Sequence, residues 1–534
     1  MNSNKRGLFV REDGSNLVFT FILVSSLFFM WAVCNGMIDV MDKHFQEVLH
    51  LSKSQSAWVQ FAHYLGYFLM SMPAGVLATK LGYKRGIIAG LLIVAVGGFW
   101  FIPATHINAM AQEGRISMAT AFIGYLAGVC VIASGLTFLE TIANPYTTVL
   151  GDKRYAATRI NLAQSCNGAG WILGPIIGSL FFYSKDAAGN NTGSETLYIP
   201  YVTVAIIVVL LAVVFAFAKM PDIQTEDEFH LDESNGGAEA VAGEINRPLV
   251  YGMLWLNSVT LMGACGVIVW LILQSLQLGA DTVNWILGAG GAVLAIAAGV
   301  ALIPFTRKVT SHSVWAHPHF TGSIMAQFLY VAAQAGIFSF FINYMTAEVP
   351  PIPHSWAAGI FQGWFETSKA GIMGLSDRGA SQLASVAFVF FLAGRVSGSA
   401  LVKKFPAHKV LGLYGLLNVL ATLIVFLKLG WLSVACVFLS YFFMSIMFPT
   451  IFALGIHGLG ARAKRASAYI VMAIMGGAVL PKLMGYVADK TDMSRGFIVP
   501  MVCFAYVAFY GFNWSKFSRS QSLTSGKSTQ EARA

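Results

Sequence analysis

Residues 75–91 read GVLATKLGYKRGIIAGL, a short basic turn set between two long apolar runs. Lys80, Lys84 and Arg85 supply the charge, and glycine and small apolar residues surround them. Residues 398–416, GSALVKKFPAHKVLGLYGL, repeat this order of glycine, small apolar residues, a basic turn and a new apolar run. Such an internal repeat predicts a chain built from two related halves.

The composition around these turns is that of a chain that crosses a membrane many times. Of the 534 residues, 56% are hydrophobic and only 11% are charged, and the mean hydropathy is +0.66. A soluble domain carries about 25% charged residues. The net charge of +9 does not indicate a nucleic-acid partner, because the Lys and Arg residues lie in short loops between apolar runs.

A helix that spans a bilayer needs about 20 mostly apolar residues. Fourteen such runs are expected, and the fold class is therefore an all-α polytopic membrane protein. The runs lie at 18–40, 56–78, 86–104, 118–146, 160–183, 199–218, 249–275, 283–305, 320–345, 379–401, 408–428, 431–455, 467–487 and 496–514. The acidic, small-residue-rich stretch 219–248 is expected to be a linker.

The distribution of basic residues predicts how the spans are oriented. With the loops assigned alternately to two sides, and with Arg395 counted as a loop residue, one side carries roughly 24 Lys and Arg residues and the other about 9. Because basic residues concentrate in cytoplasmic loops, residues 1–17 and the tail 516–534 are both expected in the cytoplasm, as is the linker. A single missed span would scramble this alternation.

Two six-helix bundles account for twelve of the expected spans. They are predicted over 18–218 and 317–515, and two additional helices are predicted within 249–310, directly after the linker. Because two spans are inserted together, the sidedness of everything after them is unchanged.

Six longer stretches carry a resemblance to a known family. They read FFMWAVCNGMIDVMDKHF (28–45), YFLMSMPAGVLATKLGYKRGI (67–87), GLTFLETIANPYTTVLG (135–151), RINLAQSCNGAGWILGPIIG (159–178), QFLYVAAQAGIFSFFINY (327–344) and SIMFPTIFALGIHGLG (445–460). The basic turn resembles the loop signature of the major facilitator superfamily, with Thr79 where that signature usually has an acidic residue. The longer stretches resemble its fucose/proton symporter family, which includes glucose/galactose and N-acetylglucosamine permeases.

The resemblance covers roughly 20–220 and 317–515 and implies a function. It implies a secondary active transporter of the cell inner membrane that takes up a neutral monosaccharide, such as L-fucose or a hexose, with a proton by alternating access. Lys80, Lys84 and Arg85 would form a gating loop. The family normally has twelve spans, so the two additional helices depart from it. The protein is expected to be a monomer in the lipid bilayer.

Two carboxylates lie inside apolar runs, Asp39 in the first span and Glu140 in the fourth. A charged side chain at the bilayer centre costs about 2.5–3.5 kcal/mol or more and usually faces a cavity or a partner. Both residues match, by resemblance, the two proton-linked acidic positions of the family. The alternative is a carboxylate held permanently by a Lys or Arg of another helix. Asp42 is expected to be an exposed loop residue.

Amide side chains are the candidate sugar-binding groups, because an amide both donates and accepts hydrogen bonds. They are Asn35, Asn144, Gln164 and Asn167 in the first half, with Trp171 continuing the same face, and Gln327, Gln334 and Asn343 in the second half. Asn343 points away from Gln327 and Gln334 on an ideal helix, and a break around Gly336 would bring it round. The alternative for each amide is a hydrogen bond between helices.

Lys482 lies inside a predicted span, directly after Pro481. In the cavity it would bind an acidic sugar or pair with a carboxylate. The alternative is a lysine that extends its stem toward the membrane interface.

Other chemistry has no supporting motif. The chain lacks G-x-x-x-x-G-K-[ST], HExxH and GxSxG, and its six cysteines lack metal-binding spacing. No enzyme activity, cofactor or metal is therefore expected. The remaining alternatives are an acidic-sugar or sodium-coupled carrier, an exporter, and a membrane sugar sensor that does not transport.

Overall fold

In the computed structural model, the described residues are 9–10, 16–49, 51–150, 156–183, 193–220, 247–275, 280–309, 313–353, 363–367, 373–456 and 463–518. Nearly all of them lie in helices, as expected for apolar runs that must satisfy their own backbone hydrogen bonds in lipid. Most of the predicted linker, at 221–246, lies outside the described residues.

The helices of the first half follow the predicted runs. They are α1 (Val18–Val48), α2 (Lys53–Ser56), α3 (Trp58–Gln112), α4 (Met118–Val149), α5 (Ala156–Phe182), α6 (Gly193–Thr196) and α7 (Tyr198–Phe217). Two predicted spans are joined in α3, which turns at Gly82 with φ 76° and ψ 172°. Only glycine adopts this conformation without strain, so Gly82 of the basic turn separates the two spans.

The second half begins with the two additional helices, α9 (Arg247–Ser275) and α10 (Ala280–Lys308). The helices that follow are α11 (Pro318–Ser339), α12 (Phe341–Ala347), α13 (Asp377–Lys404), α14 (Ala407–Phe426), α15 (Trp431–Met444), α16 (Met447–Ile456), α17 (Ala463–Met472), α18 (Gly476–Lys490), α19 (Met493–Gly496) and α20 (Ile498–Ser518), with the 3₁₀ turns η3 (Val314–Ala316) and η6 (Ala473–Met475). The sequence did not predict the antiparallel pair β1 (Phe365–Thr367) and β2 (Met373–Leu375).

The described residues contain ten helices that are long and apolar enough to cross a membrane, or eleven if α11 and α12 are one bent span. The helix Cys166–Phe182 is apolar but shorter. The all-helical, polytopic prediction is thus confirmed, and the count of fourteen stays a prediction.

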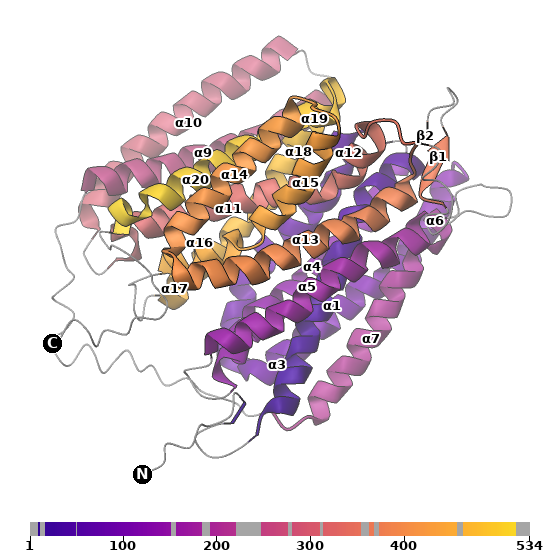
Figure 1. Ribbon diagram of the computed structural model, residues 1–534, viewed down its shortest axis with the longest axis horizontal. Coiled ribbons are helices and arrows are strands. Elements are labelled where there is room, and N and C mark those ends of the chain that lie inside the picture. Colours follow the sequence, from indigo (N-terminus) through magenta and orange to yellow (C-terminus); the bar gives the residue numbers. More distant parts are fainter. Residues whose placement is uncertain are drawn as a thin grey trace.

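The two halves lie side by side (Figure 1). The indigo-to-magenta helices form one group and the orange-to-yellow helices the other, and α13 runs along α5 where the groups meet. Within the first half, α3 and α4 approach closely, because a Cβ added at Gly135 would lie 2.6 Å from the backbone nitrogen of Val94. Small residues at such crossings let transmembrane helices pack backbone to backbone.

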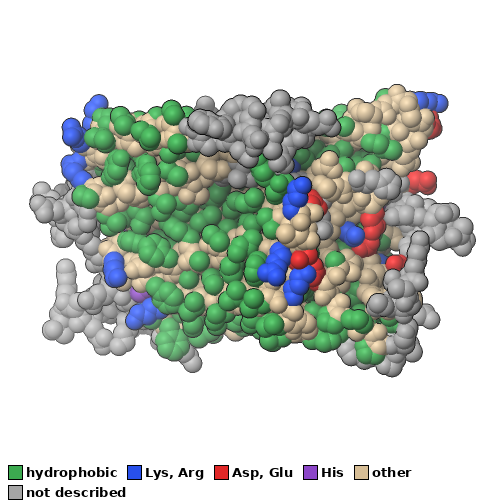
Figure 2. Space-filling model, turned by 90° about the horizontal axis from the view of Figure 1, so that it is seen from above, with side chains coloured by type: hydrophobic (Ala, Val, Ile, Leu, Met, Phe, Trp, Pro, Cys, Tyr) green, Lys and Arg blue, Asp and Glu red, His purple; other side chains and the backbone are tan. Residues whose placement is uncertain are grey.

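The helix ends fall into two groups. The start of α1 and the end of α20 lie toward one end of the molecule, and the end of α1 and the start of α13 lie toward the other, here called the far end (Figure 1). Hydrophobic side chains extend across the middle of one face (Figure 2). Lys and Arg side chains lie at its left end without acidic neighbours, and a mixture of basic and acidic side chains lies right of centre and at its right end (Figure 2). Large apolar side chains such as Phe19, Phe217 and Val293 are exposed, as expected for a surface that faces lipid.

Candidate functional site

A polar cluster inside the first half brings three helices together around Tyr67 of α3. The Tyr67 hydroxyl accepts a hydrogen bond from the Trp31 indole nitrogen of α1 and interacts with the Asn35 amide one turn further along α1. Glu140 of α4 lies close enough to act on Tyr67 electrostatically. The cluster therefore joins a predicted sugar-binding amide to a predicted proton-carrying carboxylate.

Glu140 of α4 is half-buried, and its interaction with the buried Tyr67 places it toward the protein interior. Asn144 lies one turn later in α4, and Asp39 and Asp42 lie in α1, but the side chains of all three are outside the described part of the structure. The structure thus places one of the two predicted proton-coupling groups.

The amides of α5 divide into two environments. Asn167 is buried, and its Nδ2 donates to the backbone oxygen of Phe28 in α1 at 3.4 Å. This contact matches the alternative of a hydrogen bond between helices. Gln164, one turn earlier, is half-buried.

Trp171 of α5 lies at the meeting of the two halves. Its ring stacks on Phe388 of α13, with centroids 4.9 Å apart, and meets Phe338 of α11 edge-on at 5.6 Å. The Trp171 ring also meets the Trp31 ring edge-on, with the two ring centroids 6.0 Å apart. An aromatic wall therefore connects the Tyr67 cluster to the second half, and flat aromatic faces suit the apolar faces of sugar rings.

The predicted amides of the second half lie in α11 and α12. Gln327 is fully buried and Gln334 is half-buried. The helix does break, but at Phe340 rather than at Gly336, with a bend of 46° between α11 and α12. Asn343 follows the break and pairs with Gln46 of α1. In this state, the amide contacts the first half.

Lys482 is buried in α18, and its ammonium lies 3.2 Å from the centroid of the Trp58 ring in α3. A cation over an indole face is a favourable contact, about 2 kcal/mol when removed from water. This position differs from a lysine that reaches along the lipid face to the interface, because the stem is enclosed by protein. Lys482 therefore joins the two halves.

One residue of the basic turn, Lys84, makes hydrogen bonds within the first half. The Lys84 ammonium donates to the backbone oxygens of Ala216 and Ala218, at 2.8 and 2.9 Å. Cations stabilise the exposed carbonyls at a helix C-terminus, so Lys84 caps α7. Arg85 is exposed, and the Lys80 side chain lies outside the described residues.

Sequence reasoning missed four residues, Tyr67, Trp31, Trp58 and Arg395. The three aromatic residues resemble any other apolar residue of a span, and only their partners distinguish them. Counting Arg395 as a loop residue was wrong. It lies within α13, with Nε 3.4 Å from the Ser445 backbone oxygen and its guanidinium 4.9 Å from the Phe391 ring centroid. The missed signal was its position within an apolar run.

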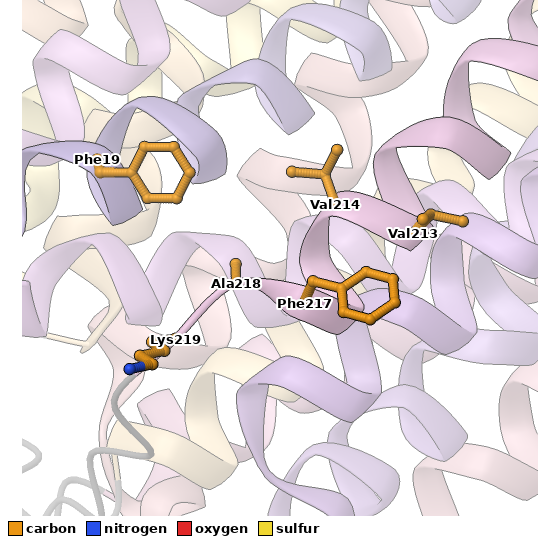
Figure 3. A pocket seen from close by; sticks show the side chains of 6 residues that line it. All are labelled: Phe19, Val213, Val214, Phe217, Ala218 and Lys219. Carbon is orange, nitrogen blue, oxygen red and sulfur yellow. The ribbon is translucent and has the colours of Figure 1, made fainter.

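A surface hollow of about 570 Å³ lies between the start of α1 and the end of α7. Figure 3 shows its lining, Phe19, Val213, Val214, Phe217, Ala218 and Lys219. With one charged residue and otherwise apolar side chains, this hollow cannot match the hydroxyls of a sugar. Among the described residues, no three His, Cys, Asp or Glu side chains lie together as a metal site would require.

Comparisons with known proteins agree with this arrangement. The family described as Major Facilitator Superfamily matches residues 20–366. The L-fucose-proton symporter of Escherichia coli (strain K12) is 29% identical over 524 residues, covering 95% of this chain and 94% of the relative. The glucose/galactose transporter of Brucella abortus biovar 1 (strain 9-941) is 27% identical over 502 residues, covering 94% and 95%.

Solved structures give the same result. The chain is similar to the major facilitator transporter FucP in the outward conformation, with a TM-score of 0.57, 27% identity, and coverage of 95% of this chain and 99% of that one. A D-xylose-proton symporter, at 11% identity and a TM-score of 0.56, shares the fold. The family resemblance predicted from the sequence is confirmed. These relatives are transporters and not enzymes, in agreement with the prediction that the chain is not an enzyme.

Proposed function

The chain belongs to the major facilitator superfamily, and from that premise we propose that it is a secondary active transporter that takes up a neutral monosaccharide, such as L-fucose or a hexose, with a proton. The observation that carries this proposal is the cluster of Glu140, Tyr67, Asn35 and Trp31 within the first half. The names of the curated relatives, which are L-fucose-proton symporters and glucose/galactose transporters, support the substrate class.

In the proposed mechanism, Asp39 and Glu140 take up and release the coupled proton. Burial of Glu140 beside Tyr67 makes the charged carboxylate costly, so proton binding lowers the barrier to moving the loaded carrier between its two states. A protonated Glu140 can donate a hydrogen bond, and the neighbouring Tyr67 hydroxyl could accept it.

Sugar binding is proposed for amides from both halves. They are Asn35, Asn144, Gln164, Asn167, Gln327, Gln334 and Asn343, with Lys482 as a further contact. Trp171 supports this arrangement, because its ring reaches from α5 to Phe338 and Phe388 in the second half. Alternating access follows when the halves rock about a site between them, with Lys80, Lys84 and Arg85 at the gating loop.

We also propose fourteen spans, with both termini in the cytoplasm and the protein in the cell inner membrane as a monomer. The Lys and Arg side chains at the left end of the face in Figure 2, which lack acidic neighbours there, support the orientation. The helical pair α9 and α10 supports the count, since two helices of this length would add two crossings to the twelve expected of two six-helix bundles. The bundles would occupy 18–218 and 317–515, and the linker 219–248 would join the first bundle to the additional pair.

A second candidate, an acidic-sugar carrier, is favoured by one observation, the burial of the Lys482 ammonium within the protein. Lys482→Ala distinguishes the candidates. If an acidic sugar is the substrate, Lys482→Ala loses the uptake of that sugar and no longer prefers it over neutral sugars. If a neutral sugar is the substrate, uptake of that sugar continues with a higher KM, because the variant loses only one of several proposed contacts.

The experiment that tests the main proposal is uptake by the purified protein in proteoliposomes, with a panel of sugars and with pH and sodium gradients imposed separately. Glu140→Gln is expected to abolish accumulation driven by the pH gradient, because the amide cannot carry the proton. A variant that still concentrates sugar against its gradient would refute the role of Glu140. If a sodium gradient alone drives accumulation, sodium is the coupling ion instead of the proton.

Asp39→Asn tests the second carboxylate. Net uptake is expected to fall strongly, because asparagine can neither bind nor release a proton, so the return of the empty carrier is no longer coupled to proton release. Unchanged net uptake would remove Asp39 from the mechanism.

A further inference from the structure

The two halves of the molecule contact each other through an ion pair at the far end. The Lys43 ammonium of α1 lies 3.6 Å from Oδ1 of Asp377, at the start of α13, and 3.5 Å from Oε1 of Glu47 on its own helix. The Lys43 and Asp377 side chains are only 19% and 21% exposed. Water therefore screens this pair less than an ordinary surface pair.

A pair of amides connects the halves one turn further along α1. Gln46 and Asn343 of α12 exchange two hydrogen bonds: Asn343 Nδ2 donates to Gln46 Oε1, and Gln46 Nε2 donates to Asn343 Oδ1 at 3.4 Å. Gln46 also donates to the Ser56 hydroxyl at 2.8 Å. The amide of Asn343 is thus oriented by the first half while the far end is closed.

The third contact is aromatic. Trp58, at the start of α3, lies under the Lys482 ammonium of α18. The three contacts join α1 and α3 of the first half to α12, α13 and α18 of the second, and the Ser381 hydroxyl of α13 donates to the Pro175 backbone oxygen of α5 at 3.0 Å beside them.

We propose that Lys43, Gln46 and Trp58, with Asp377, Asn343 and Lys482, form a far-end clasp that holds the two halves together on one side and must open in every transport cycle. All three pairs cross between the halves, so no rigid-body separation of the far end preserves any of them. The clasp sets the population of the closed state, because a contact made in only one state shifts the equilibrium by its own free energy.

The clasp also relates the gate to the proposed binding groups. Opening releases Asn343 from Gln46 and Lys482 from Trp58, and both side chains then become available to a ligand that enters from the far end. Lys43 lies four residues after Asp39 in the same helix, so a movement of α1 that breaks the pair with Asp377 also moves that position. This inference extends the proposed function and does not depend on which sugar or ion is carried.

The test is the accessibility of a cysteine placed in the contact between the halves. Ser381 is fully buried, and Ser381→Cys is a small change. The rate at which a charged methanethiosulfonate modifies S381C is measured in detergent without sugar, and the rate for the parent protein, with its native cysteines, is subtracted. In this background, Asp377→Asn or Lys43→Gln is expected to raise the rate about two- to fivefold, the range of a partly exposed ion pair.

The matched control is an ion pair at the same end that does not cross between the halves. Lys428 contacts Glu348 at 3.3 Å and Asp492 at 2.9 Å, all within the second half. Lys428→Gln is expected to leave the rate unchanged. The charge swap Lys43→Asp with Asp377→Lys is expected to restore the parent rate, because the pair is re-formed in reverse.

Two outcomes would overturn the clasp: an unchanged rate in Asp377→Asn, or an equal rise in Lys428→Gln, which would indicate general loosening. If S381C does not fold, Lys43→Cys and Asp377→Cys, which lie outside the proposed binding groups, are joined by a short reducible bifunctional reagent. Cross-linking is expected to stop transport, and reduction to restore it. Full transport by the cross-linked protein would also overturn the proposal. The accessibility measurement uses no substrate, so its result can contradict the clasp without contradicting the proposed sugar or ion.

Discussion

Gln327 of α11 has an unusual environment for an amide. It is fully buried, and neither of its side-chain polar atoms has a hydrogen-bond partner in the part of the chain that the structure describes. A buried polar group without a partner costs about 1–3 kcal/mol of stability. A residue that destabilises the resting protein in this way has a reason to be present when a ligand supplies the missing hydrogen bonds.

Gln327→Met is therefore expected to have opposite effects on stability and on transport. The melting temperature rises, because the uncompensated amide is gone and the volume is kept. The KM for sugar rises about three- to tenfold, the effect of losing one or two neutral hydrogen bonds. Thermal unfolding in detergent and initial uptake rates measure both.

Asn418 of α14 provides the control, since it too is fully buried with no partner for either amide atom among the described residues. It lies outside the proposed site, so Asn418→Leu should raise the melting temperature and leave KM unchanged. A lower melting temperature with an unchanged KM in Gln327→Met would contradict a binding role for Gln327.

Asp492 and Lys428 form a charged pair outside the spans. Burial raises the pKa of Asp492, but hydrogen bonds from the Lys428 ammonium and the Arg495 backbone N–H outweigh it, and the net pKa lies below its ordinary 3.8. The hydrogen bond to Asp492 is also the main reason that the pKa of Lys428 lies above its ordinary 10.5. The charged Asp492 therefore stabilises the fold above pH 3.8, and this stabilisation is lost as the pH falls through the lower pKa of the folded state. The charged Lys428 stabilises the fold below pH 10.5, and this stabilisation is lost as the pH rises through the higher pKa of the folded state.

Asp492→Asn isolates this charge, because asparagine still caps α19 by accepting from Arg495. The variant is expected to lower the melting temperature by the same small amount at about pH 5 and pH 9, since both groups stay charged throughout that range. The difference should shrink only in acid below the ordinary pKa of the carboxyl group. A difference that changes steadily between pH 5 and pH 9 would show that another group titrates with the pair.

At the scale of elements, α9 and α10 form a hairpin that is mostly self-contained. Arg247 at the start of α9 donates to the backbone oxygens of Thr306 and Arg307 at the end of α10. Among the described residues, α9 provides contacts with the second bundle: Asn257 donates to the Thr321 backbone oxygen at 2.9 Å, and Trp270 meets Tyr486 edge-on at 4.5 Å. The apolar residues of α10, such as Val293 and Ile296, are mostly exposed.

Deletion of residues 247–308 is expected to leave transport in place, with KM within about twofold of the full chain. Two crossings are removed together, so the orientation of the second bundle is kept, and no proposed site residue is lost. Uptake by proteoliposomes measures KM, and gel filtration verifies folding. A deletion variant that is folded but inactive would assign the hairpin a role in the transport cycle.

The sequence predicts elements well where one signal dominates. Long apolar runs predict the helices, and Gly82 within the basic turn allows the sharp reversal in α3. The bend at Phe340 is harder to predict, because no proline marks it and neighbouring helices decide where the backbone yields. The interruption between α15 and α16 does have a signal in the sequence, since Pro449 cannot donate a hydrogen bond to the Ser445 carbonyl. The β1–β2 pair is only three residues long on each strand, too short for a periodic pattern.

The same distinction applies to the site. Buried polar residues such as Glu140 and Gln327 can be found from the sequence, because an ionisable or amide group in an apolar run is costly. Their partners cannot, since Tyr67, Trp58 and Asp377 become important only when different helices meet. Lys482 was identified as unusual, but its contact with Trp58 joins segments more than 400 residues apart, as their residue numbers show.

At the scale of the whole molecule, the orientation of the chain is testable with reporters that work on one side of the membrane. Alkaline phosphatase fused after Gly114, at the far end, is expected to be active, and a fusion after Ala534 to be inactive, because phosphatase folds only outside the cytoplasm. A green fluorescent protein at Ala534 should fluoresce. Reversed activities would invert the topology and place the far-end clasp on the cytoplasmic side.

The same reporter tests the number of spans. A phosphatase fusion after Ser275, between α9 and α10, is expected to be active, and one after Val309 inactive, because each additional helix then crosses the membrane once. The 29 residues of each helix would extend about 43 Å at 1.5 Å per residue, longer than the hydrocarbon core of about 30 Å. An inactive fusion after Ser275, with Gly114 active and Val309 inactive, would mean that the hairpin does not cross, and the chain would have twelve spans.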